Sequence, residues 1–256
     1  MLGSGGARGI AHIGVIETLE QQGFEMISVT GCSMGAVVGG MYCAGFLQEY
    51  KEWLLTLTKS KVFSLFDFTF TSSGFVKGEK VLQKMQELTG DQHIEKFPIP
   101  FTAVATDILH NKEVHYRRGN LYKALRASIG IPGVFTPVLE EQTYLVDGGV
   151  LNPLPLNLVH KQSEEEWVVA VNINAAPHAA HPSVSSKRKA YNVVDLLNTS
   201  YDCTQDRLTK LMIQFHQPEI LVELPRSLCS VFEFHKSKML IEAGSEACKK
   251  ALRKRH

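Results

Sequence analysis

A serine between two glycines is the first candidate for chemistry in this 256-residue chain. The run Gly-Cys-Ser-Met-Gly contains Gly31, Ser33 and Gly35. An apolar, β-rich run, 26–30, precedes it, and a run of small residues typical of a helix, 36–46, follows it. A serine at a sharp strand-to-helix turn needs such glycines, because side chains there would crowd its hydroxyl. The pattern predicts a nucleophile elbow with Ser33 as nucleophile; the competing interpretation is a turn whose serine caps a helix.

The glycine-rich opening, residues 3–9, is the second candidate, and a predicted helix over 8–22 follows it. Consecutive glycines let backbone amides point into one concavity beside a helix N-terminus, where an anion is favoured. A phosphate and an oxyanion would suit this loop equally. A dinucleotide loop is the rival interpretation, but its GxGxxG register falls on Ser4, Gly6 and Gly9. No acidic residue ends a clear second strand about 20 residues further on, as ribose binding requires.

The third candidate is Asp147, which ends an apolar run, 144–146, and precedes Gly148 and Gly149. Binding sites of α/β proteins lie at the carboxyl ends of strands, and glycines there allow another loop to approach closely. A simple turn-forming Asp-Gly pair is the competing interpretation.

The elements that must position these residues alternate between strand and helix patterns. Helical periodicity covers 8–22 and 78–88, and strand patterns fall at 26–30, 101–106, 144–146, 167–173 and 220–224. This alternation predicts one α/β domain with a mostly parallel central sheet covered by helices on both faces, a three-layer α/β/α sandwich. Only Met1 and Leu2 precede the glycines, so we expect either a stub of a first strand or an upstream segment missing from this chain.

Composition narrows the classes of partner and compartment. Apolar residues make up 44% of the chain, so a large core is expected. The formal net charge is +1, so we expect no electrostatic field strong enough to attract nucleic acid. No membrane-spanning run or export signal is visible. Five cysteines, odd in number and without CxxC spacing, favour free thiols in a reducing compartment, hence a cytoplasmic location. His178 and His181, in a predicted surface loop over 175–189, are a weak metal signal, and we expect no metal or cofactor.

Taken together, the three candidates resemble the patatin-like phospholipase family, whose hydrolases share a glycine-rich loop, a GxSxG elbow and a DGG or DGA motif. Arg126-Ala127-Ser128 and Ile131-Pro132-Gly133, with Phe135 and Pro137, resemble the family segment before the aspartate motif. The resemblance covers residues 1–174 and implies a patatin-like catalytic core there. Residues 175–256 are expected to complete the same domain with a surface loop, C-terminal helices and a strand.

The resemblance implies a role for each matching residue. Ser33 matches the nucleophile and Asp147 the base of a Ser/Asp dyad, while the amides of Gly5 and Gly6 match the oxyanion hole. Arg8 matches a basic residue that either holds the loop or contacts a substrate phosphate; a solvated arginine is the competing interpretation. Ser4 departs from the family's usual three glycines. The implied activity is a cofactor-independent serine acyl hydrolase that cleaves fatty-acyl esters of phospholipids, lysophospholipids or related lipids through an acyl-enzyme.

Several alternatives remain open in the sequence. A Ser-His-Asp triad needs a histidine, but none of the candidates lies in a motif that marks a base; they are His160, His178, His181, His216 and His235. His12, on the first helix, is a candidate for lining the pocket. A patatin-fold regulatory adaptor without activity is the main functional alternative, and a nucleotide-binding enzyme is a third.

Two further segments bear on the lipid substrate. The aromatic run 62–70, with Phe75, fits either an apolar lid that contacts the acyl chain or a buried core strand. The basic residues of the C-terminal run fit either contact with anionic headgroups or a solvated helix end; they are Lys249, Lys250, Arg253, Lys254 and Arg255. We therefore expect at most transient contact with the inner membrane surface, and the oligomeric state stays open.

Overall fold

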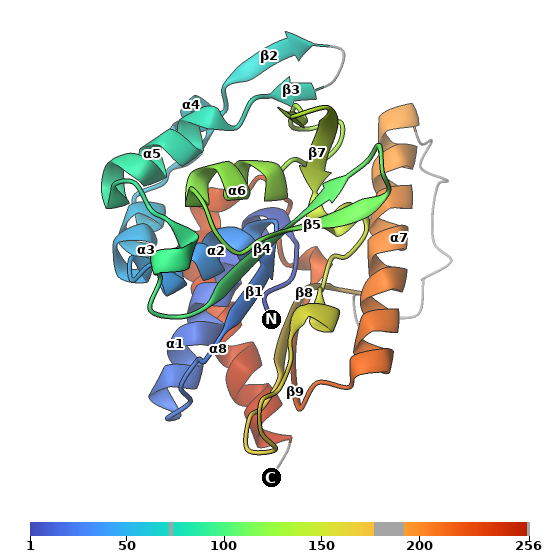
Figure 1. Cartoon of the computed structure of the whole chain (residues 1–256). Coiled ribbons are helices and arrows are strands. Elements are labelled where there is room, and N and C mark those ends of the chain that lie inside the picture. The colour runs from blue at the N-terminus through green and yellow to red at the C-terminus, as the bar shows by residue number, and fades with distance from the viewer. Residues whose placement is uncertain (72–73, 177–191, 255–256) are drawn as a thin grey trace, which may run out of the picture.

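A central sheet flanked by helices organises the chain, as the computed structural model in Figure 1 shows. The structure describes residues 1–71, 74–176 and 192–254. The predicted surface loop over 175–189, with His178 and His181, therefore lies almost entirely outside the described residues.

Strand pairing divides the sheet into a parallel part and an antiparallel part. β1 (Val29–Cys32) pairs parallel with β4 (Phe101–Asp107), and β8 (Val169–Ala175) pairs parallel with β9 (Ile220–Pro225). Leu2 forms parallel bridges to Gly31 of β1 and to Val171 of β8. The two residues before the glycine loop thus join the two parallel pairs in one sheet, as a stub of a strand would.

The antiparallel part lies beyond β4. The remaining strands of the central sheet are β5 (Lys112–Tyr116), β6 (Val138–Glu140) and β7 (Thr143–Asp147). β4 pairs antiparallel with both β5 and β7, and β6 pairs antiparallel with β7. The predicted α/β class is confirmed, and the sheet is mixed: short hairpins join β4 to β5 and β6 to β7, and β7 lies beside β4 after a long connection.

Helices cover the two faces of the sheet (Figure 1). The α-helices are α1 (Ala11–Gln21), α2 (Met34–Cys43), α3 (Leu47–Leu55), α4 (Lys59–Leu65), α5 (Glu79–Thr89), α6 (Leu121–Ser128), α7 (Val193–His216) and α8 (Ser237–Arg253). Val171 and Ile173 of β8 belong to the core formed with α1 and α8, whereas Ala170 packs with residues of α7. Successive residues of one strand therefore face opposite helical layers.

The two helices at the ends of the chain pack unusually closely. A Cβ atom on Gly14 of α1 would lie 1.9 Å from the Ile241 carbonyl oxygen, and one on Gly244 of α8 would lie 2.0 Å from that of Ala11. Glycine is required at both crossing points, because no side chain fits between the backbones. The C-terminal helix is thereby fixed against the helix that follows the glycine loop.

The aromatic run 62–70 does not form a core strand. Its first part belongs to α4, and the rest enters β2 (Phe68–Thr71), which pairs with β3 (Gly74–Val76) in a hairpin outside the central sheet. The run therefore supplies no strand to the central sheet, and its helical residues Val62 and Leu65 pack in the main core.

The cysteines agree with the expectation of free, mostly packed thiols. All five cysteines are free thiols, and four of them are buried. In the described ranges, no helix has the length and apolar content needed to cross a bilayer.

Candidate active site

Ser33 occupies a strained turn between β1 and α2. Its backbone has φ 55° and ψ −123°, a conformation that costs free energy for any residue other than glycine. A Cβ on Gly31 would lie 2.4 Å from the Gly35 carbonyl oxygen, and one on Gly35 would lie 2.2 Å from that of Leu2. The Ser33 side chain makes no capping hydrogen bond to α2. These features fit a nucleophile elbow, and the helix-cap interpretation does not hold.

A second serine holds this turn in place. Ser128, at the end of α6, is fully buried; its Oγ accepts a hydrogen bond from the Ser33 amide at 2.9 Å and donates one to the Val104 carbonyl at 2.6 Å. The strained peptide is thereby tied to β4. Sequence reasoning missed this role, although the Arg-Ala-Ser run that contains Ser128 was part of the family resemblance.

Asp147 lies at the carboxyl end of β7, where pairing with Ala105 of β4 fixes its position. Its side chain is fully buried, and its Oδ1 accepts hydrogen bonds from the Gly149 amide at 2.7 Å and from the Cys32 thiol at 3.8 Å. Burial raises the pKa of Asp147 to about 6, and contacts with Ser33, Gly149 and Cys32 partly offset that rise.

The fold therefore brings Ser33 close to Asp147, 114 positions later in the chain. The Ser33 hydroxyl stabilises the Asp147 carboxylate, yet Oδ2 accepts no hydrogen bond from any described residue. Unliganded hydrolases often show such loose contacts, which tighten when substrate binds. Oδ2 is the oxygen left available to take a proton.

The glycine loop presents two amides without acceptors. The amides of Gly3, Ser4 and Ala7 donate to the carbonyls of other segments, at 2.9 to 3.0 Å. Those of Gly5 and Gly6 donate to no atom in the part of the chain that the structure describes. Gly6 also lines the pocket at Ser33, so one of these two residues lies beside the Ser33 side chain.

Arg8 holds the glycine loop from behind. Its guanidinium is buried, with Nε donating to the Gly5 carbonyl at 3.1 Å and Nη1 to the Arg226 carbonyl at 2.9 Å. Carbonyl and amide of a trans peptide point in opposite directions, so this bond directs the Gly6 amide away from Arg8. Of the three interpretations of Arg8, the geometry favours the one in which it holds the loop.

No histidine in the part of the chain that the structure describes takes a comparable place. The residues that line the pocket at Ser33 are Gly6, Met34, Ile129, Ile131, Phe135, Val231, Phe232 and Phe234. His12 lies behind the loop, where its Nε2 bonds the Gly3 carbonyl at 2.9 Å, and burial lowers the pKa of His12 to about 4. It therefore does not line this pocket. No described histidine bonds Asp147, so the geometry gives a triad no support.

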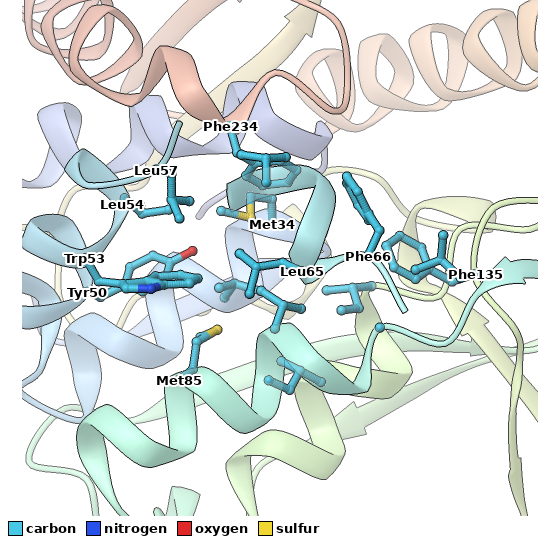
Figure 2. A pocket seen from close by; sticks show the side chains of 17 residues that line it. Met34, Tyr50, Trp53, Leu54, Leu57, Leu65, Phe66, Met85, Phe135 and Phe234 are labelled. Atoms are coloured by element: carbon cyan, nitrogen blue, oxygen red, sulfur yellow. The ribbon is translucent and has the colours of Figure 1, made fainter. Parts of the chain in front are cut away.

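An apolar cavity adjoins the small pocket at Ser33. The pocket has a volume of about 50 Å³ and the cavity about 80 Å³. They share the side chains of Met34, Ile129, Phe135 and Phe234. Figure 2 shows the cavity between helices, with Tyr50 and Trp53 at one end and Phe66 and Phe135 at the other. Sequence reasoning did not find it, except that Val62, Leu65 and Phe66 of the aromatic run line it.

A wider groove opens on the other side of Phe66 and Phe232. Its volume is about 760 Å³, and it runs between α4, the loop 132–134 and the N-terminal part of α7. Its lining includes no charged side chain among the described residues, and its polar side chains are Asn198 and Tyr201. The pocket at Ser33 therefore lies between a narrow inner cavity and an open apolar groove.

A strained serine turn between a strand and a helix, on a sheet covered by helices, resembles the arrangement of α/β serine hydrolases. Residues 1–160 match the model of the patatin-like phospholipase family, and the chain belongs to that family. Membership assigns it to the lipid hydrolases as a class.

Similar proteins support the same class. An uncharacterised NTE family protein of Mycobacterium tuberculosis is 31% identical, over 98% of this chain and 90% of its own length. Lysophospholipase NTE1 of Cryptococcus neoformans is 32% identical over 66% of this chain, which spans only 11% of that protein. Neuropathy target esterase sws of Drosophila melanogaster is 29% identical over 68% of this chain and 13% of its own length.

A solved structure supports the fold. The crystal structure of VipD from Legionella pneumophila superposes with a TM-score of 0.51, covering 98% of this chain and 66% of that one. Sequence identity is 12%, so this similarity concerns the fold alone.

Proposed function

We propose that the protein is a serine acyl hydrolase that cleaves lipid esters with a Ser33/Asp147 dyad. The observation that carries the proposal is the proximity of a strained, buried serine to a buried carboxylate whose pKa is raised to about 6. A base with a pKa near the working pH combines a large ionised fraction with useful proton affinity.

The first half of the reaction forms an acyl-enzyme. Asp147 accepts the proton of the Ser33 hydroxyl as its Oγ attacks the ester carbonyl carbon. Negative charge develops on the carbonyl oxygen, and the amides of Gly5 and Gly6 stabilise it; one such donor contributes roughly 100- to 1000-fold in rate. The intermediate then collapses, the C–O bond to the alcohol breaks, and Asp147 returns its proton to the leaving oxygen.

The second half of the reaction releases the acid. Asp147 accepts a proton from water as the water oxygen attacks the acyl-serine carbonyl. A second oxyanion forms at the same amides and collapses, and the Ser33 oxygen leaves with the proton from Asp147. The fatty acid and the resting enzyme result, and the steps use only groups of this chain, ester and water.

The inner cavity is the proposed site for the acyl chain. It is lined almost wholly by hydrocarbon, aromatic and thioether side chains, and it adjoins Ser33. An alkyl chain that leaves water for such a cavity contributes about 0.8 kcal/mol for each buried methylene. Phospholipids, lysophospholipids and related lipids are the proposed substrates, and the fungal relative's name, lysophospholipase, supports that class.

We also propose a cytoplasmic location with transient contact to a membrane surface through the open groove. Exposed apolar side chains lie along its rim, with 67% of Phe63 and 64% of Leu197 accessible. Vesicles of zwitterionic phospholipid should bind the wild type more tightly than a Phe63→Ser, Leu197→Ser double variant. Equal binding would contradict the contact.

The dyad is tested by substitution and by chemical labelling. Ser33→Ala and Asp147→Asn should each lower turnover of a short-chain ester by about 1000-fold or more, because neither half of a dyad works alone. A fluorophosphonate should label Ser33 in the wild type and fail to label Ser33→Ala. Retained activity in either variant would overturn the dyad, and folded wild type that resists labelling would favour a regulatory adaptor.

A further inference from the structure

The cavity contains one buried hydroxyl that nothing in the protein explains. Tyr50 of α3 is only 3% exposed, and its hydroxyl points into the cavity in Figure 2. That oxygen has no hydrogen-bond partner among the described residues, and Tyr50 lines the cavity. Burial raises the pKa of the phenol, so the group stays protonated and offers a donor.

The rest of the cavity wall offers this hydroxyl few hydrogen-bond partners. Among the described side chains that line the cavity, only Tyr50 and Trp53 carry an oxygen or nitrogen atom. Their rings are 5.8 Å apart, and Trp53 is half-buried. A trapped water needs two to four polar partners, and the described side chains of this wall offer it only the Tyr50 hydroxyl and the Trp53 N–H group. The cavity is therefore expected to stay dry in the free protein.

A donor that faces an apolar cavity without a partner is costly. Leaving such a group without a partner costs roughly 1–3 kcal/mol, whereas phenylalanine would fill the same space without that cost. Retaining the hydroxyl is understandable if a ligand supplies the missing acceptor. The acceptor must arrive on an apolar body, because every other side chain around it is hydrocarbon, aromatic or thioether.

We propose that the cavity selects acyl chains that carry an oxygen atom within the chain, held by a hydrogen bond from Tyr50. An oxo group fits best, because it accepts this bond and brings no donor of its own into the dry cavity; a hydroxyl would leave its own hydrogen unpaired. Tyr50 lies at the end of the cavity opposite Phe135, a side chain shared with the pocket at Ser33, so the oxygen belongs away from the ester (Figure 2). The inference rests on the proposed function for the identity of the ester, but the binding site itself does not depend on catalysis.

Binding of free fatty acids tests the proposal without any turnover. Decanoic acid and its oxo derivatives, with the oxo group at successive positions, are titrated into wild-type protein and Tyr50→Phe by calorimetry. At one or two neighbouring positions, the wild type should prefer the oxo acid, and Tyr50→Phe should lose about tenfold of that preference, as expected for one buried hydrogen bond. Equal preference in the two proteins, or no oxo acid bound better than decanoic acid, overturns the proposal.

Two controls separate recognition from damage. Trp53→Phe removes the other lining N–H group and should keep the preference; loss in this variant alone would overturn the assignment to Tyr50. Tyr50→Phe should unfold at the same temperature as the wild type or higher, because the deleted hydroxyl has no partner in the free protein. A lower unfolding temperature would show a partner within the protein and would also overturn the proposal.

The two proposals fail in different ways. Tyr50-dependent binding of an oxo acid by protein that neither hydrolyses esters nor accepts a fluorophosphonate would overturn the hydrolase and leave the binding site standing. Hydrolysis of plain and oxo-substituted esters in the same ratio by wild type and Tyr50→Phe would leave the hydrolase standing and overturn the selectivity.

Discussion

The pocket at Ser33 and the inner cavity adjoin at Met34, yet they are built from different parts of the chain. At Ser33, main-chain turns at strand ends and the glycine loop set the positions of the polar groups. In the cavity, side chains from α3, α4 and α5 form the walls, and few polar atoms face inward. In the proposed mechanism, the first region fixes where charge develops, and the second determines what apolar group fits beside it.

The two regions should therefore tolerate substitution to different degrees. A site built from backbone turns depends on residues that no other type can replace, such as glycines at close approach or a serine at positive φ. A cavity built from side chains tolerates exchange of one apolar residue for another, and each exchange changes the volume and shape of the cavity. Substitution should therefore remove activity in the first region and alter substrate choice in the second.

The largest expected effect concerns Asp147. Because its pKa is raised from 3.8 to about 6, the native state binds more protons than the unfolded chain between these values. Its ionisation therefore lowers stability as pH rises from about 4 to 6, and above that range the cost reaches up to about 3 kcal/mol. Asp147→Asn should be inactive and yet gain stability over the wild type at pH 8, with a smaller difference at pH 4.

Denaturant unfolding of both proteins at the two pH values measures this difference. An Asp147→Asn protein that is less stable than the wild type at pH 8 would contradict the burial of a costly charge. The rate of the wild type should also fall about tenfold for each pH unit below 6, because the base must be ionised. A flat profile between pH 4 and 6 would remove Asp147 as the base.

A smaller effect is expected at Arg8. Arg8→Lys keeps the charge but loses the Nε contact to the Gly5 carbonyl, so the Gly6 amide should be less well oriented. We expect kcat to fall about 10- to 100-fold with little change in KM, the size typical of a misplaced catalytic group. Steady-state kinetics with one ester measures both constants.

Arg226→Lys is the matched control, because Arg8 contacts only the main-chain carbonyl of Arg226. It should retain near wild-type kcat. A rise in KM without loss of kcat in Arg8→Lys would point instead to a substrate contact.

The smallest effect is expected in the cavity. Leu82 of α5 is buried and lines it, so Leu82→Trp should fill part of the roughly 80 Å³ and shorten the accepted acyl chain. We expect kcat/KM for a decanoyl ester to fall about tenfold relative to that for an acetyl ester, since several methylenes lose their burial. Leu88→Trp, on the same helix but 38% exposed, should leave the ratio unchanged.

Comparison of ester hydrolysis across chain lengths measures the ratio. An equal loss on both esters would indicate damage to the fold, and an unchanged ratio would show that the acyl chain lies elsewhere.

Much of the framework could be predicted from the sequence. The helices expected at 8–22 and 78–88 appear as a 3₁₀ turn with α1, and as α5, and the strands at 101–106 and 220–224 appear as β4 and β9. The strand expected at 26–30 begins later, at Val29, and the residues before it belong to a loop. Local periodicity is reliable where one face is steadily buried, and it is weakest at the ends of elements.

Other features could not be found in local patterns. The hydrogen bond that the Ser33 amide donates to Ser128 joins residues 95 positions apart, and the cavity combines side chains from several helices. The aromatic run gave an ambiguous pattern, because a short apolar segment fits a helix or a strand equally well.

The sequence by itself determined the chemistry that this protein can be expected to perform. Local backbone geometry dictates glycines at tight turns, with a serine between two of them and an aspartate before another pair. These residues are therefore visible as sequence motifs. Only the tertiary structure decided that the Asp147 carboxyl is buried with a raised pKa, that Arg8 faces the Gly5 carbonyl, and that the Tyr50 hydroxyl lies unpaired in an apolar cavity. Burial and long-range contacts depend on how distant segments pack, and no local spacing records them.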